Sequence, residues 1–186
     1  MQKISKYKTA TTYAQAWFDA AKENHIEDAV MEEVRQLLVS MQQDTSLWAV
    51  LFQPADDNKE KVKIIRELGQ RIGLTELSIN TLSMVTENER LNLLKTILNT
   101  FIKLYYKDKG IIEVSVDTAV ELTSTQHKKL QSTLEAKLQS PVVLNYRIKP
   151  EILGGLAIRY DSFLIDDTLI GKLKNIKRIL LQQKAS

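Results

Sequence analysis

The amino-acid sequence predicts a mainly α-helical protein with a smaller α/β part. A six-helix N-terminal bundle is expected over residues 1–109, followed by a small β-α-β-β-β-α domain over residues 110–186. From Ile4 to about Lys109 the apolar residues recur every three or four positions, which is the period of an amphipathic helix. After Gly110 the period falls to two, which is that of a half-buried strand. The change of period marks the predicted domain boundary.

The first half divides into helices at local breaks in the apolar pattern. Asn24-His25 interrupts the first helix, Gln53-Pro54 ends the third, and Asp57 with Glu60 resembles a capping box at the start of the fourth. The predicted helices are 4–23, 26–43, 45–52, 57–71, 75–87 and 90–108. Short connections between them are typical of a bundle.

The second half alternates strand and helix patterns. Apolar residues alternate with polar ones from Ile112 to Val120, and Thr123 with Gln126 forms a capping-box pattern for a helix that ends before Pro141. Three more alternating stretches follow. Asp167 or Thr168 is placed to cap a last helix. Its apolar stripe is Leu169, Leu173, Ile176 and Leu180.

Composition excludes several classes of protein. There is no cysteine, so disulfides and thiolate chemistry are absent. The net charge of +3 is weak for a chain that binds nucleic acid over its whole surface. Residues 1–109 hold 15 basic and 15 acidic side chains, against 11 and 8 in residues 110–186, so the positive excess lies in the second part. We expect neither a secretory signal nor a membrane span.

The residues that most often carry catalysis are not grouped in this sequence. His25 and His127 lie on separate elements, and Gly154-Gly155 lacks the residues of a phosphate-binding loop. Asp166-Asp167 is better suited to capping a helix than to holding a cation. We therefore expect no catalytic residue, cofactor or metal. A nucleic-acid-binding adaptor that uses the basic last helix remains as an alternative function.

The first helix carries more apolar surface than one contact requires. Tyr7, Thr11, Ala14, Phe18 and Ala21 form one stripe, Tyr13, Ala16 and Ala20 form a second, and Trp17 lies between them. One interpretation places this helix at the centre of the bundle. The other makes the spare surface a groove for an amphipathic partner helix, together with the fifth helix. The predicted groove residues are Tyr13, Ala14, Trp17, Phe18, Ile79 and Leu82.

Three stretches of sequence resemble one known family. They are KYKTATTYAQAWFDAAKE, the segment TENERLNLLKTILNTFIKLYYKDKGIIEVSV with its Asn88 and Arg90, and PEILGGLAIRYDSFLIDDTLIGKLKNIKRIL. Together they resemble the delta subunit of bacterial F-type ATP synthase, the counterpart of the mitochondrial oligomycin-sensitivity-conferring protein (OSCP). The sequence departs from the family pattern at Asp167, where glycine is usual, and at Thr168, where serine is usual.

The resemblance implies a non-catalytic stator subunit. Its N-terminal bundle would bind the N-terminus of an alpha subunit of the catalytic head, and its C-terminal domain would bind the membrane-anchored b subunits of the peripheral stalk. One copy per complex is expected at the cytoplasmic face of the bacterial plasma membrane, without direct membrane insertion or nucleic acid. It would couple proton translocation to ATP synthesis. We interpret the signature residues Gly154, Gly155, Asp166 and Thr168 as structural.

Overall fold

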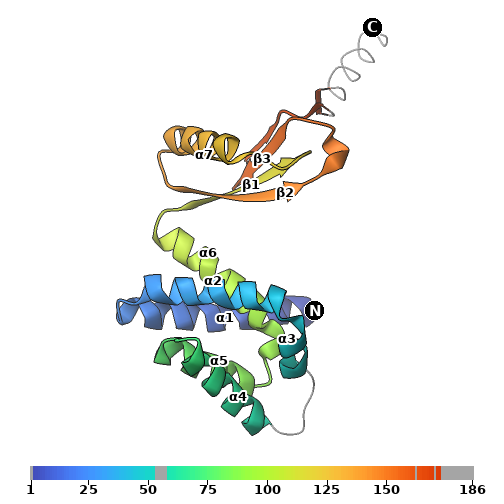
Figure 1. The fold of residues 1–186 in the computed structure, drawn as a ribbon. Helices are drawn as coiled ribbons and strands as arrows, with labels where there is room; N and C mark the ends of the chain where they lie inside the picture. The colour runs from blue at the N-terminus through green and yellow to red at the C-terminus, as the bar shows by residue number, and fades with distance from the viewer. Residues whose placement is uncertain (1, 53–57, 162, 170, 173–186) are drawn as a thin grey trace. The chain divides into compact units, whose positions relative to one another are not determined.

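The computed structural model describes residues 2–52, 58–161, 163–169 and 171–172 (Figure 1). The chain is mainly helical, with a small four-stranded mixed sheet after the helices. It divides into two compact units, Met1–Tyr105 and Tyr106–Ser186, which are described separately below. No helix among the described residues is both long enough and apolar enough to cross a bilayer.

The first unit is built from helices close to those predicted. They are α1 (Gln2–Glu23), α2 (Glu27–Gln43), α3 (Thr45–Phe52), α4 (Asn58–Arg71), α5 (Glu76–Glu87) and α6 (Leu94–Asp108), with a short 3-10 turn, η1 (Leu91–Leu93), before α6. The predicted capping box at Asp57 lies outside the described residues. His25 and Glu89, at the ends of α1 and α5, have positive φ values of 55° and 57°, and so reverse the chain without glycine.

The core of the first unit is organised around α6. Leu94, Ile97, Leu98 and Phe101 are fully buried along this helix. Their spacing of three and four residues places them on one stripe, which the other helices cover. Helix α1, which carries more apolar surface than one contact requires, is therefore one of the helices that pack against α6.

The second unit contains the sheet. Its elements are β1 (Ile112–Thr118), α7 (Ser124–Leu138), β2 (Val142–Ile148), the 3-10 turn η2 (Pro150–Ile152), β3 (Leu156–Tyr160) and β4 (Phe163–Asp166). The strand order is β2-β1-β3-β4. β1 and β2 are parallel and joined through α7, whereas β3 and β4 are added antiparallel. The predicted capping box of α7 is confirmed, because Thr123 and Gln126 each bond the other's backbone N–H.

The sheet has one face packed on α7. Val114 and Val116 of β1, Val142 of β2 and Ile158 of β3 form an apolar core with Leu134 of α7. Beyond β4, Leu169, Gly171 and Lys172 are helical, as expected for the start of the last helix. The rest of that helix, including Leu173, Ile176, Leu180 and its basic face, lies outside the described residues.

Candidate partner-binding surfaces

The α1 residues of the predicted groove are core residues of the first unit. Ala14, Trp17 and Phe18 are all buried. The Trp17 and Phe101 ring centroids are 5.3 Å apart, and those of Phe18 and Phe101 are 5.6 Å apart in an edge-to-face arrangement. The Trp17 Nε1 is buried with no hydrogen-bond partner among the described residues. Trp17 and Phe18 therefore fix α1 to α6.

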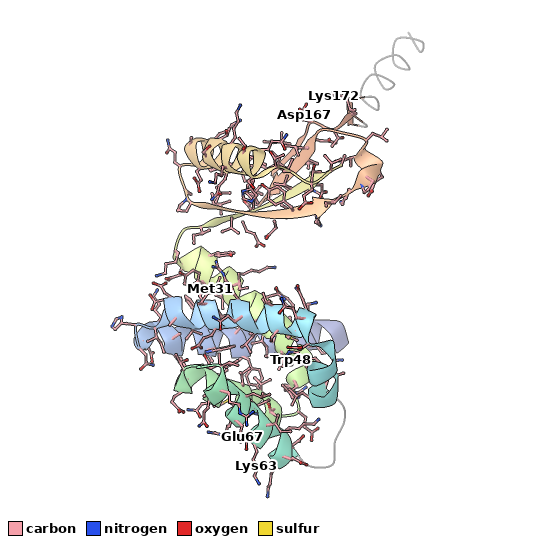
Figure 2. All side chains as sticks on the ribbon, in the orientation of Figure 1. Met31, Trp48, Lys63, Glu67, Asp167 and Lys172 are labelled. Atoms are coloured by element: carbon pink, nitrogen blue, oxygen red, sulfur yellow. The ribbon has the colours of Figure 1, made fainter. Side chains whose placement is uncertain are left out.

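The α5 residues of the predicted groove are also buried, but they face other neighbours. Ile79 packs on Gly69 of α4, where a Cβ atom would lie 2.8 Å from Ile79 Cγ1. Because only glycine fits at this separation, Gly69 is what allows α4 and α5 to approach so closely. Leu82 lines an apolar cavity of about 260 Å³, together with Trp48 of α3 (Figure 2) and Leu94.

The structure thus separates the six predicted groove residues. Five of them are inside the unit, and only Tyr13 is half-exposed. The part of α1 that reaches the surface is the second stripe, in which Ala16 is exposed and Ala20 is half-exposed like Tyr13. Helix α5, which contacts α1, exposes Met84. The accessible apolar side chains of these two helices include Tyr13, Ala16 and Ala20 of this stripe, Tyr7 of the other α1 stripe, and Met84 of α5.

A buried carboxylate that sequence reasoning missed holds α5 in place. Glu33 of α2 accepts hydrogen bonds from Thr75 N (2.6 Å), Thr75 Oγ1 (3.1 Å) and Ser78 Oγ. Thr75 is the N-cap of α5, so the negative charge of Glu33 also lies at the positive end of that helix dipole. The available signal was the position of Glu33 next to Val34 and three residues after Val30, on the apolar stripe of α2.

The signature residues form a turn in the second unit. Gly155 has φ +80°, and a Cβ there would lie 2.2 Å from the backbone oxygen of Asp167. Backbone hydrogen bonds join Leu169 N to Gly154 O and Asp167 N to Leu156 O, each at 3.0 Å. The glycine pair therefore lets the segment that follows β4 pass closely against the start of β3.

The acidic and hydroxyl members of the signature cap the segment that follows. Asp166 Oδ1 accepts hydrogen bonds from Thr168 N (3.1 Å) and Thr168 Oγ1 (2.7 Å), and Thr168 Oγ1 accepts one from Gly171 N (2.9 Å). Asp167 is exposed and pairs with Lys172 at 2.7 Å (Figure 2). Asp167 is not among the described residues with positive φ, so it replaces the usual glycine without left-handed strain.

A second missed carboxylate lies at the centre of the sheet. Asp117 of β1 is 2% exposed and is bonded by Arg147 Nε (2.8 Å), Lys149 Nζ (2.8 Å) and Arg159 Nη2. Burial raises the pKa of Asp117, but hydrogen bonds from Lys149 and Arg147 and the charges of Arg147 and Arg159 outweigh it, so the pKa is lowered. This carboxylate therefore stays ionised inside the sheet.

The histidines and acidic residues do not assemble a reaction centre in the part of the chain that the structure describes. His25 is exposed, and the ring of His127 packs against Tyr146 with centroids 4.9 Å apart. No group of three or more His, Cys, Asp or Glu side chains among the described residues is placed to hold a metal ion.

The fold has a counterpart among solved structures. A chain of the Toxoplasma gondii mitochondrial ATP synthase hexamer superimposes with a TM-score of 0.77 at 20% identity, over 92% of this chain and 97% of that one. At this identity the likeness shows a shared architecture of helices followed by a small sheet.

Sequence comparison gives the family. The model of the "ATP synthase delta (OSCP) subunit" family matches residues 9–180. ATP synthase subunit delta of Rickettsia bellii is 32% identical over 168 residues, 90% of this chain and 89% of that protein. The same subunit of Bartonella henselae is 33% identical over 178 residues, 93% and 90% of the two chains. The chain belongs to the ATP synthase delta (OSCP) subunit family. It is a non-catalytic structural subunit of the F-type ATP synthase, a component of its stator.

Proposed function

We propose that this subunit links the alpha subunit of the catalytic head to the membrane-anchored b subunits of the peripheral stalk. Residues 1–109 bind the N-terminus of alpha, and residues 110–186 bind b. The observation that carries the proposal is the family match over residues 9–180, which spans both compact units of the chain. A stator with two separately folded ends keeps the head from turning with the rotor, and so couples proton translocation to ATP synthesis.

The proposed head contact is the surface formed by Tyr13, Ala16 and Ala20 of α1 with Met84 of α5. Small alanines beside larger apolar side chains let a partner helix approach closely, in the helix-in-groove mode. Beneath this surface, Ala14, Trp17, Phe18, Ile79 and Leu82 act as buried support that fixes α1 and α5. In this proposal, the five buried residues of the predicted groove support the accessible apolar surface, which a partner helix contacts.

The proposed position of the subunit is the cytoplasmic face of the bacterial plasma membrane. One copy per complex is held there through the stalk, with no membrane insertion, nucleic acid or cofactor of its own.

The head contact is tested by calorimetric titration of the full chain with a peptide from the alpha-subunit N-terminus. Ala16→Glu places a charge on the apolar surface and is expected to weaken binding at least about tenfold, because a buried charge without a partner is costly. The control is Gln15→Glu, which adds the same charge at the neighbouring exposed position and leaves the affinity within about twofold. Equal binding of the two variants, or no saturable binding by the wild type, contradicts the proposed contact.

Coupling is tested separately. Membranes stripped of this subunit are expected to recover proton-driven ATP synthesis when the wild-type chain is added back. Recovery that is complete without the added chain would show that the stator function does not depend on it.

A further inference from the structure

The face of the sheet that α7 does not cover carries an unusual charge arrangement. Side chains alternate along a strand, so Val114 and Val116 of β1 face α7 and Asp117 faces the other way. The strand register places Asp117 opposite Arg147 of β2 and opposite Ala157 of β3, two residues from Arg159. Both arginines therefore lie on this open face, on either side of Asp117.

Three cations share a single carboxylate at this point. The side chains of Arg147, Lys149 and Arg159 are 53%, 33% and 46% exposed, while that of Asp117 is 2% exposed. One buried negative charge cannot neutralise three positive ones. The cations also keep unused N–H donors that face solvent, since a guanidinium has five and an ammonium three. We call Arg147, Lys149 and Arg159 the cation triad.

Asp117 determines how the cation triad is presented. Long basic side chains normally lose rotamer entropy when they are fixed in one geometry. Here the buried carboxylate already holds them, so an incoming anion meets a preorganised site. A single cation would balance the charge of Asp117, so keeping this carboxylate ionised does not by itself require three.

Among the described residues, Asp117 is the only carboxylate within ion-pair distance of the cation triad. Glu113, on the same face of β1, accepts a hydrogen bond from Asn145. Asp166 caps Thr168, and Asp167 pairs with Lys172. Residues 173–186 contain four basic residues and no acidic one, so this segment does not have the charge to complement the triad. A partner with acidic side chains would complement the charge that the triad leaves exposed.

We propose that the cation triad docks an acidic segment of a protein partner. Carboxylates match the fork geometry of arginine, and two of them would balance the two uncompensated charges. The inference rests on the proposed function, in which the second unit binds the stalk, and it identifies the partner segment as an acidic stretch of the b subunit. The triad steers this stretch to the open face of the sheet and fixes its register.

The test uses the full chain and the soluble cytoplasmic part of the b subunit from the same ATP synthase. Affinity is measured by calorimetry at low and high salt. Arg147→Gln/Arg159→Gln is expected to bind about tenfold more weakly at low salt and to lose most of the salt dependence, because two charge pairs are removed. Arg147→Lys/Arg159→Lys keeps the charges and restores most of the binding. Amide NMR spectra of both variants establish that the sheet is folded.

The control variant is Lys128→Gln/Lys137→Gln. It removes the same number of charges from exposed positions of α7, on the other side of the sheet, and is expected to bind within about twofold of the wild type. A loss equal to that of the arginine variant would mean that net charge alone matters, and would overturn the proposal.

The remaining outcomes separate the inference from the proposed function. If the wild type binds b and the arginine-to-glutamine variant binds it equally at both salt concentrations, the triad proposal fails and stalk binding stands. If the wild type does not bind b, stalk binding fails and the triad proposal fails with it. If that variant loses binding to anionic vesicles or single-stranded RNA but not to b, the surface recognises phosphate, and the protein-docking proposal is wrong.

Discussion

Replacing Glu33 with alanine is expected to destabilise the helical unit strongly. The carboxylate joins α2 to the start of α5 through the backbone N–H and hydroxyl of Thr75 and the hydroxyl of Ser78. Ser78 is completely buried, so water cannot replace the lost acceptor. The variant leaves donors without a partner at the end of a helix that has few other means of satisfying them.

The size of the effect follows from the number of orphaned groups. A buried donor left unsatisfied costs about 1–3 kcal/mol, and loss of the negative charge at the α5 N-terminus adds about 0.3–1 kcal/mol. Part of this is recovered, because the Thr75 and Ser78 hydroxyls already bond each other at 3.0 Å. We expect the free energy of unfolding to fall by about 2–4 kcal/mol for Glu33→Ala. Glu33→Gln, which keeps one acceptor oxygen, should lose roughly half as much.

The assay is urea unfolding followed by tryptophan fluorescence. Both tryptophans, Trp17 and Trp48, belong to the first unit, so the signal reports that unit alone. Glu32→Ala is the control, because Glu32 is exposed and its nearest cation, Arg35, is 3.8 Å away. The control should change the free energy of unfolding by less than about 0.5 kcal/mol. A Glu33→Ala value no larger than that of the control would refute the role assigned to Glu33.

Three further predictions concern the core and the sheet. Phe101→Ala removes the ring that contacts both Trp17 and Phe18, and should lower the free energy of unfolding by about 3–5 kcal/mol. It should also shift the tryptophan emission. An unchanged emission spectrum would contradict the packing of Trp17 on Phe101. Gly155→Ala should lower the free energy of unfolding of the sheet by more than about 2 kcal/mol, measured by urea unfolding followed by amide NMR. The control is Gly110→Ala, which also has positive φ but open space around it, and which should cost about 1 kcal/mol. Equal losses would argue against the close approach of Asp167 to Gly155. The lowered pKa of Asp117 means that its ionised form stabilises the folded state above the unfolded pKa of about 3.9, and that this stabilisation is lost as pH falls through the lower folded pKa. The same NMR assay should therefore show the advantage of wild type over Asp117→Asn disappearing below about pH 4, and a pH-independent difference would contradict it.

The element order could be predicted because periodicity is a local property of the backbone. The change at Lys109-Gly110, the capping box at Thr123 and the break at Pro141 each act within a few residues of themselves. The strand order could not be obtained in this way. Whether β2 pairs with β1 in parallel, and whether β3 lies between β1 and β4, depends on contacts far apart in the sequence.

The candidate surfaces were harder to predict for a related reason. A wide apolar arc shows that a helix such as α1 has several neighbours, but it does not say which of its stripes they cover. The structure places Trp17 and Phe18 against Phe101, and leaves Tyr13 and Ala16 accessible. Asp117 escaped notice because an acidic residue in an alternating strand is normally assigned to solvent, and its burial depends on cations from two other strands.

The central place of β1 in the sheet has a mechanical consequence. This strand follows directly after α6, and it is hydrogen-bonded to β2 along Ile112–Thr118 on one edge and to β3 on the other. Tension carried along the chain from α6 enters the sheet through this one strand. Because β1 is hydrogen-bonded to a neighbour on each edge, separating it from the sheet requires breaking two ladders, whereas an edge strand is held by one. The strand that receives this load is therefore one of the two interior strands of the sheet.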